Sequence, residues 1–326
     1  HDIAVDFMVG AQLEGFDRMV HLTEENDFIV LEGDEYLSSP IDRRPKFHLY
    51  KPNIALLSGI AWDHINVFPT YDNYVEQFRI FVDSIVKGGS ITYNEEDPEV
   101  DRVVKASENA IRKLPYNTPD YAVENGQTIL ETPEGPMPIE VFGKHNLSNL
   151  AGAKWICQNM GVDEDDFYEA IASFKGASKR LEKIAEGRTC VAYKDFAHSP
   201  SKVMATTKAV KEQFPDRKLI ACLELHTYSS FNPEFLREYK GALEAADVAA
   251  VFYLPESVRI KKLKEVTPSQ ISEAFVRDDL QIFTDADDFK NFVFGQEYDN
   301  SVLLLMSSGN YGGLNLEEVK VLVEKY

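Results

Sequence analysis

The 326-residue sequence is poor in cysteine, and it contains no long apolar run. Its three cysteines, Cys157, Cys190 and Cys222, follow no CxxC spacing, which argues against a disulfide framework or a zinc site. We expect each of them to pack as a small apolar side chain in a reducing compartment. No apolar stretch is long enough to cross a bilayer, and residues 1–6 lack the basic start and apolar core of a signal peptide. These absences favour a cytoplasmic protein.

Basic residues are also few, because 34 lysines and arginines stand against 54 acidic residues and the formal net charge is −20. Nucleic acid is not expected as a partner, since neutralising its phosphates needs a basic surface. An anionic membrane surface is disfavoured for the same reason. An acidic protein can still bind a nucleotide locally through lysine, arginine, backbone N–H groups and Mg²⁺. Apolar residues make up 44% of the chain, which is enough for a large core, and the length suggests about two domains.

Apolar runs and amphipathic segments alternate along the chain, which is typical of an α/β protein. The runs 28–31 and 53–60 are expected to be strands that are buried on both faces of a parallel sheet. Helices are expected at 71–86, 97–113, 146–160 and 164–174, with β-hairpins in the glycine- and proline-containing stretch 121–143.

A second alternating block predicts a separate, doubly wound α/β unit. Its strands are expected at 189–194, 218–225, 248–254, 280–283 and 301–306. Its helices are expected at 201–214, 233–245, 268–276, 286–294 and 316–324. We therefore place two domains, at residues 1–176 and 177–326.

Polar residues directly follow the first two expected strands, at the edge where open α/β sheets bind ligands. Glu32 opens an acidic stretch, and a carboxylate there can hold Mg²⁺, although an acidic loop in solvent is the alternative. His64 follows Asp63 after the next strand. Its imidazole can ligate a divalent metal or position a phosphate, although a polar strand end without chemistry is the alternative.

Two asparagines open the expected helix at 146–160. Asn146 and Asn149 are three residues apart, beside His145, so their amides lie on one helix face. An amide suits the edge of adenine because it offers both a donor and an acceptor. Helix N-capping by asparagine is the alternative.

Asp195 and His198 follow another expected strand. Ser199 and Pro200 have a structural explanation as the start of the next helix, whereas Asp195 and His198 do not. The stretch 309–313 lacks the GxGxxG spacing of a dinucleotide loop and is expected to be a tight turn. This absence argues against a dehydrogenase.

Taken in order, these motifs resemble those of the Mur ligases, which build the peptide stem of bacterial cell-wall precursors. The resemblance covers nearly the whole chain and is closest to the Mpl branch, which acts in peptidoglycan recycling. It is carried by residues 32–36, 42–47, 179–182, 193–198 and 306–313. It implies that residues 1–176 are most of a P-loop-type central ATPase domain and that 177–326 are a Rossmann-like C-terminal domain.

The resemblance also implies an activity. ATP would phosphorylate the carboxylate of UDP-N-acetylmuramate to an acyl phosphate, which the amine of the tripeptide L-Ala-γ-D-Glu-meso-diaminopimelate would attack. The alanine-adding ligases of the family, with L-alanine as acceptor, are the alternative. Glu32 would ligate the Mg²⁺ that bridges the ATP phosphates, and His64 would serve a second metal near the acyl phosphate. His198 would lie near the phosphates or the incoming peptide. The residues that would bind ATP are His145, Asn146, Asn149, Arg180 and Asp195.

The chain departs from the family pattern in three places. It has no GxxxxGK[ST] phosphate loop, so we expect a fragment that lacks the phosphate-loop strand, is inactive alone and self-associates through exposed sheet edges. Residues 77–80 contain no lysine that could be carbamylated, which fits the Mpl and alanine-adding branches. Residues 225–230 replace a Pro-Arg-Ser-Asn-Thr-type stretch, which leaves the acceptor open. The alternative from a different functional class is a protein that binds nucleotide or peptide without catalysing a reaction.

Overall fold

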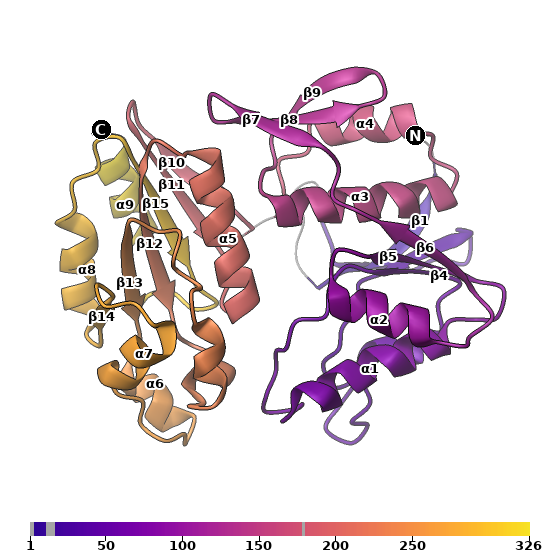
Figure 1. The fold of residues 1–326 in the computed structure, drawn as a ribbon, viewed down its shortest axis with the longest axis horizontal. Coiled ribbons are helices and arrows are strands. Elements are labelled where there is room, and N and C mark those ends of the chain that lie inside the picture. Colours follow the sequence, from indigo (N-terminus) through magenta and orange to yellow (C-terminus); the bar gives the residue numbers. More distant parts are fainter. Residues whose placement is uncertain (1–2, 11–16, 178–179) are drawn as a thin grey trace. The chain divides into compact units, whose positions relative to one another are not determined.

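The structure, a computed structural model, describes residues 3–10, 17–177 and 180–326 (Figure 1). The chain divides into two compact units, His1–Ser178 and Lys179–Tyr326, two residues beyond the expected boundary. Both units combine helices with parallel strands, so the α/β class is confirmed. None of the helices in the described ranges has the length and apolar character needed to cross a bilayer.

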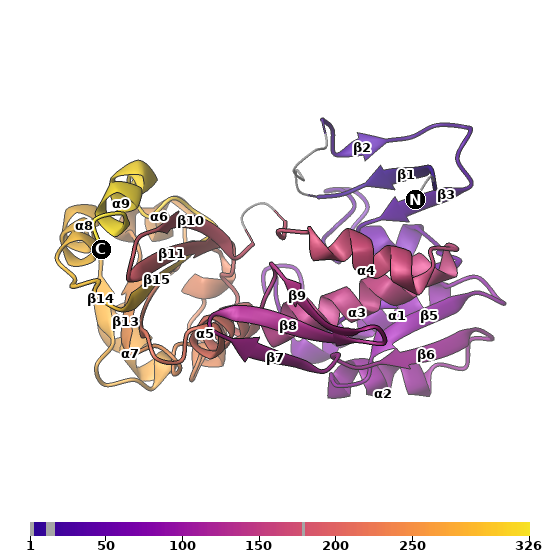
Figure 2. The ribbon, with the colours of Figure 1, turned by 90° about the horizontal axis from the view of Figure 1, so that it is seen from above.

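Unit 1 holds its parallel strands in two separate three-stranded sheets, with strand orders β2-β1-β3 and β4-β5-β6 (Figure 2). The first sheet contains β1 (Val5–Met8), β2 (Val20–His21) and β3 (Phe28–Leu31), and the second contains β4 (Ile54–Leu57), β5 (Ser90–Asn94) and β6 (Arg112–Tyr116). Strand β1 pairs in parallel with β3 and antiparallel with β2, whereas the second sheet is parallel throughout.

The expectation that β3 is buried on both faces was wrong. Ile29 and Val30 are neighbours in this strand, so they point to opposite faces, and they are 51% and 40% exposed. Within the described residues, β3 pairs only with β1, so its other edge is open. An apolar run therefore predicted the strand and its parallel pairing but not what covers it.

Helices α1 (Tyr71–Ser84) and α2 (Pro98–Ala106) pack on the β4–β6 side of unit 1. Their shared core includes Phe78, Val82, Ile91 and Val104, together with Phe47 from the short helix η1 (Lys46–Leu49). The expected helix 97–113 was too long, because residues 112–116 form β6. Pro115 cannot continue a helix, and it is tolerated in β6 because this strand is at an edge of its sheet.

The hairpins expected in 121–143 are confirmed as an antiparallel sheet. It consists of β7 (Tyr121–Glu124), β8 (Gln127–Thr132) and β9 (Gly135–Ile139), and it shares a core with α3 (Lys144–Asn159) and α4 (Glu164–Ala172). Helix α3 also packs against β4 and β5. Gly152 permits this approach, because a Cβ there would lie 2.9 Å from a methyl carbon of Leu56.

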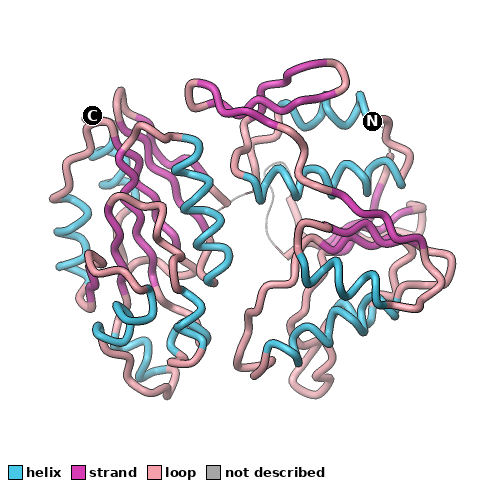
Figure 3. The backbone as a smooth tube through the Cα atoms, in the orientation of Figure 1, coloured by secondary structure: helices cyan, strands magenta, loops and turns pink. Residues whose placement is uncertain are grey.

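Unit 2 is built on one six-stranded sheet with the order β10-β11-β15-β12-β13-β14. The strands are β10 (Glu182–Glu186), β11 (Cys190–Asp195), β12 (Lys218–Glu224), β13 (Val248–Phe252), β14 (Gln281–Phe283) and β15 (Ser301–Met306). All of them are parallel except β10. The run of strands and helices along this unit is drawn in Figure 3.

Helices cover both faces of this sheet, with α5 on one face and α8 and α9 on the other (Figure 1). The helices of unit 2 are α5 (Pro200–Gln213), α6 (Pro255–Ile260), α7 (Pro268–Phe275), α8 (Ala286–Phe294) and α9 (Leu316–Val323), with short η2 (Ser229–Phe231) and η3 (Phe235–Tyr239). The doubly wound expectation is confirmed. The expected helix 233–245 is only η3, because Gly241 turns the chain with φ +72°.

The three cysteines are free thiols, as expected. Cys190 and Cys222 lie inside the sheet core of unit 2. Burial raises the pKa of Cys190 to about 11 and that of Cys222 to about 12, so both are neutral and unreactive at physiological pH.

Candidate functional site

The loops that follow β3 and β4 bring an acid that was not among the predicted site residues to His64. The Nε2 atom of His64 lies 3.5 Å from Oε1 of Glu35. The hydroxyl of Tyr74, on α1, donates a hydrogen bond to the same oxygen at 3.3 Å. Burial, followed by the negative charges of Glu35 and Asp63, raises the pKa of Tyr74 well above its usual range. Glu35 is therefore shared by an imidazole and a phenol that stays a donor.

The backbone of His64 is held in an uncommon conformation. Its φ is +55°, in the left-handed region that side-chain-bearing residues rarely adopt. The Oδ1 atom of Asp63 accepts a hydrogen bond from the His64 N–H at 2.7 Å. The N–H groups of Val67 and Phe68 donate to the His64 carbonyl at 2.8 and 2.9 Å. Such conformations cluster at functional sites, and here local hydrogen bonds maintain it.

Residues 42–47 have a structural role in placing Glu35. The Nζ atom of Lys46 lies 2.6 Å from Oδ2 of Asp34, the residue before Glu35. The next residue, Phe47, donates its N–H to the Asp34 carbonyl at 3.1 Å and is buried in the unit 1 core. The acidic stretch is thereby tied to the core at the point from which Glu35 reaches His64.

Glu32 lies directly after β3 and is exposed. Its N–H donates to the Met8 carbonyl at 2.9 Å, and its carboxylate accepts a hydrogen bond from the Gly10 N–H. One face of the carboxylate is thus bound by backbone, while the rest is open to solvent. Its role as a metal ligand stays a prediction.

The side chains of unit 1 fit a magnesium ion that takes most of its ligands from water and phosphate oxygens. In the described parts of the chain, no three His, Cys, Asp or Glu side chains gather closely enough to enclose a metal. Mg²⁺ needs no such enclosure, because it commonly binds one or two carboxylates and completes its shell with water and phosphate oxygens. Glu32 can supply one such carboxylate ligand, and the Glu35–His64 pair can contribute separately to another ion.

The predicted adenine-binding residues lie at the start of α3. Asn146 is half-buried, and its Nδ2 donates to the Phe142 carbonyl at 2.8 Å, which leaves Oδ1 as an acceptor. Asn149 is exposed and makes no side-chain hydrogen bond to any residue that the structure describes. His145 is half-buried in the first turn of the same helix, whose N-cap is Gly143 with φ +88°. The structure therefore presents two amides from adjacent turns of one helix, as expected.

An unpredicted acid, Glu96, ties α3 to the neighbouring sheet edge. Its Oε1 lies 3.0 Å from Nζ of Lys144, and its Oε2 accepts the Thr118 N–H at 2.9 Å. Partial burial acts to raise the pKa of Glu96, but hydrogen bonds from Thr118 and Lys144 outweigh it, so the pKa is lowered. A charged Glu96 thus joins the ends of β5 and β6 to the first residue of α3.

In unit 2, Asp195 closes the loop that carries Arg180. The carboxylate of Asp195 is buried, and its two oxygens accept the N–H groups of Leu181 and Ala197, both at 2.6 Å. The exposed guanidinium of Arg180 lies 5.1 Å from the ring centre of Phe196. The structure brings these two predicted nucleotide-binding residues together through one loop, and it gives Asp195 a structural task as well.

His198 is oriented by backbone contacts. Its Nδ1 lies 2.8 Å from the Phe196 carbonyl, which can only accept, so Nδ1 carries the proton. The hydroxyl of Tyr239 donates to the His198 carbonyl. The imidazole is therefore held in one tautomer at the carboxyl end of β11.

The carboxyl end of β12 carries a second buried acid, which was not among the predicted site residues. Glu224 is 3% exposed and is the last residue of β12. Strand β15 lies between β11 and β12, and the helices after β11 and β15 cover opposite faces of the sheet (Figure 1). Ligands of open α/β sheets bind where the winding reverses in this way. A lone acid at the end of an otherwise apolar run was the available signal.

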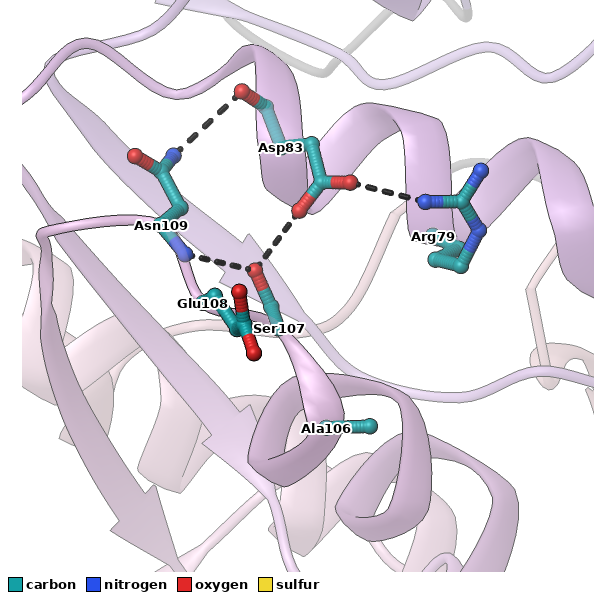
Figure 4. Close-up of a pocket in the computed structure, with 6 residues that line it drawn as sticks. All are labelled: Arg79, Asp83, Ala106, Ser107, Glu108 and Asn109. Carbon is teal, nitrogen blue, oxygen red and sulfur yellow. Dashed lines mark hydrogen bonds and ion pairs between the residues drawn. The ribbon is translucent and has the colours of Figure 1, made fainter.

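A hollow of about 430 Å³ in unit 1 has a structural explanation (Figure 4). It is lined by Arg79, Asp83, Ala106, Ser107, Glu108 and Asn109. The amide of Asn109 donates to the carbonyls of Val82 and Ile85 at 3.0 and 2.8 Å, and the Ser107 hydroxyl donates to Asp83 at 2.7 Å. These bonds cap the end of α1, and none of the predicted site residues lines the hollow.

Comparison with known proteins finds a family match in the first half of the chain. Residues 14–157 match the Mur ligase middle domain. The UDP-N-acetylmuramate–L-alanine ligase of Desulfitobacterium hafniense (strain Y51) is 26% identical over 251 residues, which are 74% of this chain and 56% of that protein. The match therefore spans little more than half of that relative's length.

Solved structures of Mur ligases share the fold. The murein peptide ligase of Psychrobacter arcticus 273-4 gives a TM-score of 0.64 at 19% identity, over 98% of this chain and 72% of that one. The MurF ligase of Thermotoga maritima in complex with ADP gives 0.68 at 17% identity, over 99% and 74%. Residues 14–157 therefore match the Mur ligase middle domain, and the chain shares the fold of the solved Mur ligases.

Proposed function

We propose that the complete protein is an ATP-dependent ligase that joins the carboxylate of UDP-N-acetylmuramate to an amine through an acyl phosphate. The observation that carries the proposal is a Mur ligase middle domain in which the predicted His64 meets an acid at the carboxyl edge of the strands. Such an edge is where an α/β sheet binds its ligand.

The residues of each unit would have distinct tasks in this reaction. Glu32 would hold the Mg²⁺ of the ATP, and His64, beside Glu35, would hold a second metal ion. Such ions supply charge neutralisation at the phosphates when bound. The amides of Asn146 and Asn149 would bind the edge of adenine beside His145. In unit 2, Arg180 and Asp195 would bind the nucleotide. His198, held in one tautomer, would donate or accept a proton near the phosphates or the incoming amine.

For the acceptor, we propose the tripeptide L-Ala-γ-D-Glu-meso-diaminopimelate. The Mpl-like stretches 42–47 and 193–198 support it, and both contribute to the candidate site through Lys46 and Asp195. L-alanine is the second candidate, because the sequence relative from Desulfitobacterium is an L-alanine ligase by name.

ADP release by the complete gene product tests the proposal, with UDP-N-acetylmuramate, Mg-ATP and each acceptor in turn. Release with the tripeptide alone supports the recycling ligase, and release with alanine alone supports the biosynthetic one. No release with either acceptor, combined with measurable ATP binding, would leave a binding protein without catalysis. We expect the 326-residue chain alone to give no product.

A further inference from the structure

We infer that Glu224 is a positioning residue that fixes the turn after β15 and orients His226 for the amine acceptor of the reaction. The inference rests on the proposed function for the identity of that acceptor. Its structural part rests on the contacts of the Glu224 carboxylate.

One oxygen of the Glu224 carboxylate accepts the hydrogen bonds that hold the turn. Its Oε2 accepts hydrogen bonds from the Ser307 hydroxyl and from the Tyr311 N–H, the latter at 2.9 Å. The Ser307 oxygen in turn accepts the Gly309 N–H at 2.7 Å. One buried acid therefore sets the path of residues 307–311.

The turn is shaped to fit this acid closely. A Cβ at Gly309 would lie 2.7 Å from Oε2 of Glu224, so only glycine permits the observed approach. Tyr311 adopts φ +54°, which bends the chain so that its N–H faces the carboxylate. Ser307 also donates its N–H to the Asp195 carbonyl at 2.9 Å. The ends of β11, β12 and β15 are thereby joined into one rigid edge.

The other oxygen of Glu224 faces His226. Its Oε1 lies 3.9 Å from Nδ1 of His226, whose side chain is 41% exposed. Glu224 Oε1 accepts no hydrogen bond from any residue in the described ranges. His226 is therefore exposed to solvent, whereas the neighbouring Glu224 is buried. The imidazole lies at the edge where the winding of the sheet reverses.

A buried carboxylate here is not required by the sheet. Strand β12 is fully paired to β13 and β15 through its backbone, and an apolar side chain would fill the same place without the cost of burying a charge. An acid that the fold does not need, placed behind an exposed imidazole at the ligand edge, points to a positioning role.

Steady-state kinetics of the complete gene product test this role with three variants. Glu224→Ala removes both hydrogen bonds to the turn, so we expect the acceptor KM to rise about tenfold or more while the ATP KM stays within about twofold. Glu224→Gln should restore the acceptor KM to within about threefold, because its amide oxygen can accept the same two bonds. Ser307→Ala should give a smaller rise. Ser301→Ala, a matched serine at the other end of β15, should change neither KM.

Hydrogen exchange of the Tyr311 amide gives a second readout that needs no turnover. The amide should be protected in the wild type and in Glu224→Gln, and it should exchange faster in Glu224→Ala. If Glu224→Ala leaves the acceptor KM and the Tyr311 protection unchanged while the wild type turns over, the inference fails and the proposed function stands. If the wild type releases no ADP with either acceptor, the proposed function fails, and the positioning role falls with it.

Discussion

Tyr74→Phe tests the hydrogen bond that joins Glu35 to the unit 1 core. The substitution keeps the ring and its packing but removes the hydroxyl that donates to Glu35. A hydrogen bond to a charged group contributes about 1.5–3 kcal/mol, and this one is long and its acceptor is partly exposed. We therefore expect the free energy of unfolding of unit 1 to fall by about 1 kcal/mol at pH 7.

Tryptophan fluorescence during urea unfolding measures this change in the right unit. The chain has only two tryptophans, Trp62 and Trp155, and both are in unit 1. Tyr93→Phe is the matched control, since Tyr93 is also 4% exposed in the same core but its hydroxyl bonds to no residue that the structure describes. Equal losses in both variants would refute the assignment of a stabilising Tyr74–Glu35 bond.

The pH dependence of the free energy of unfolding tests the direction in which the Tyr74 pKa is shifted. The pKa of Tyr74 is raised in the folded unit, so the folded form keeps the proton while an unfolded chain loses it above about pH 10. The wild type should therefore lose stability relative to Tyr74→Phe at about 1.4 kcal/mol per pH unit above that value. The deficit of Tyr74→Phe at neutral pH should shrink and then reverse in alkaline solution. A deficit that stays constant up to pH 11 would contradict the raised pKa.

Three further predictions concern other parts of the molecule. Gly309→Ala should destabilise unit 2 by about 1–3 kcal/mol in calorimetry because of the contact with Glu224, whereas Gly33→Ala, with open space around it, should leave the stability of its own unit 1 unchanged. The open, apolar edge of β3 should make the 326-residue chain self-associate, and Val30→Lys should lower its mass in light scattering; a monomeric wild type would contradict this. Asn149→Ala should weaken ATP binding about tenfold in calorimetry without changing the melting temperature, and unchanged binding would remove Asn149 from the nucleotide site.

The sequence predicted most strands and helices of unit 2 closely, because these are continuous apolar runs or amphipathic segments. It did not predict β10 or α6, and the helix expected at 233–245 is only η3. It failed where a structural feature depends on neighbours. The run 28–31 predicted a strand, but the exposure of Ile29 and Val30 is set by what lies beside β3. The segment 97–113 was expected to be one helix, although Pro115 shortly beyond it indicated an extended strand.

The sequence predicted where the candidate site residues lie along the chain, but not which side chains contact them. The sequence placed His64, Asp195 and the α3 asparagines at strand or helix ends. The structure has Asp195 at the end of β11 and the asparagines in the first turns of α3, whereas His64 lies in a loop well beyond the end of β4 at Leu57. Which carboxylate meets His64 depends on how Lys46 and Phe47 fold the acidic stretch, and no spacing in the sequence shows this. Glu224 was passed over because a single acid at the end of a buried run does not reveal its partners on β15.

Transfer of ¹⁸O from substrate to phosphate tests the proposed chemistry most directly. The complete gene product would be given UDP-N-acetylmuramate labelled in its carboxylate, together with Mg-ATP and the tripeptide or L-alanine. An acyl phosphate requires one labelled oxygen to leave with phosphate as the amide forms, so one ¹⁸O should appear in the inorganic phosphate for each amide made. Amide formation with unlabelled phosphate would contradict the acyl-phosphate route.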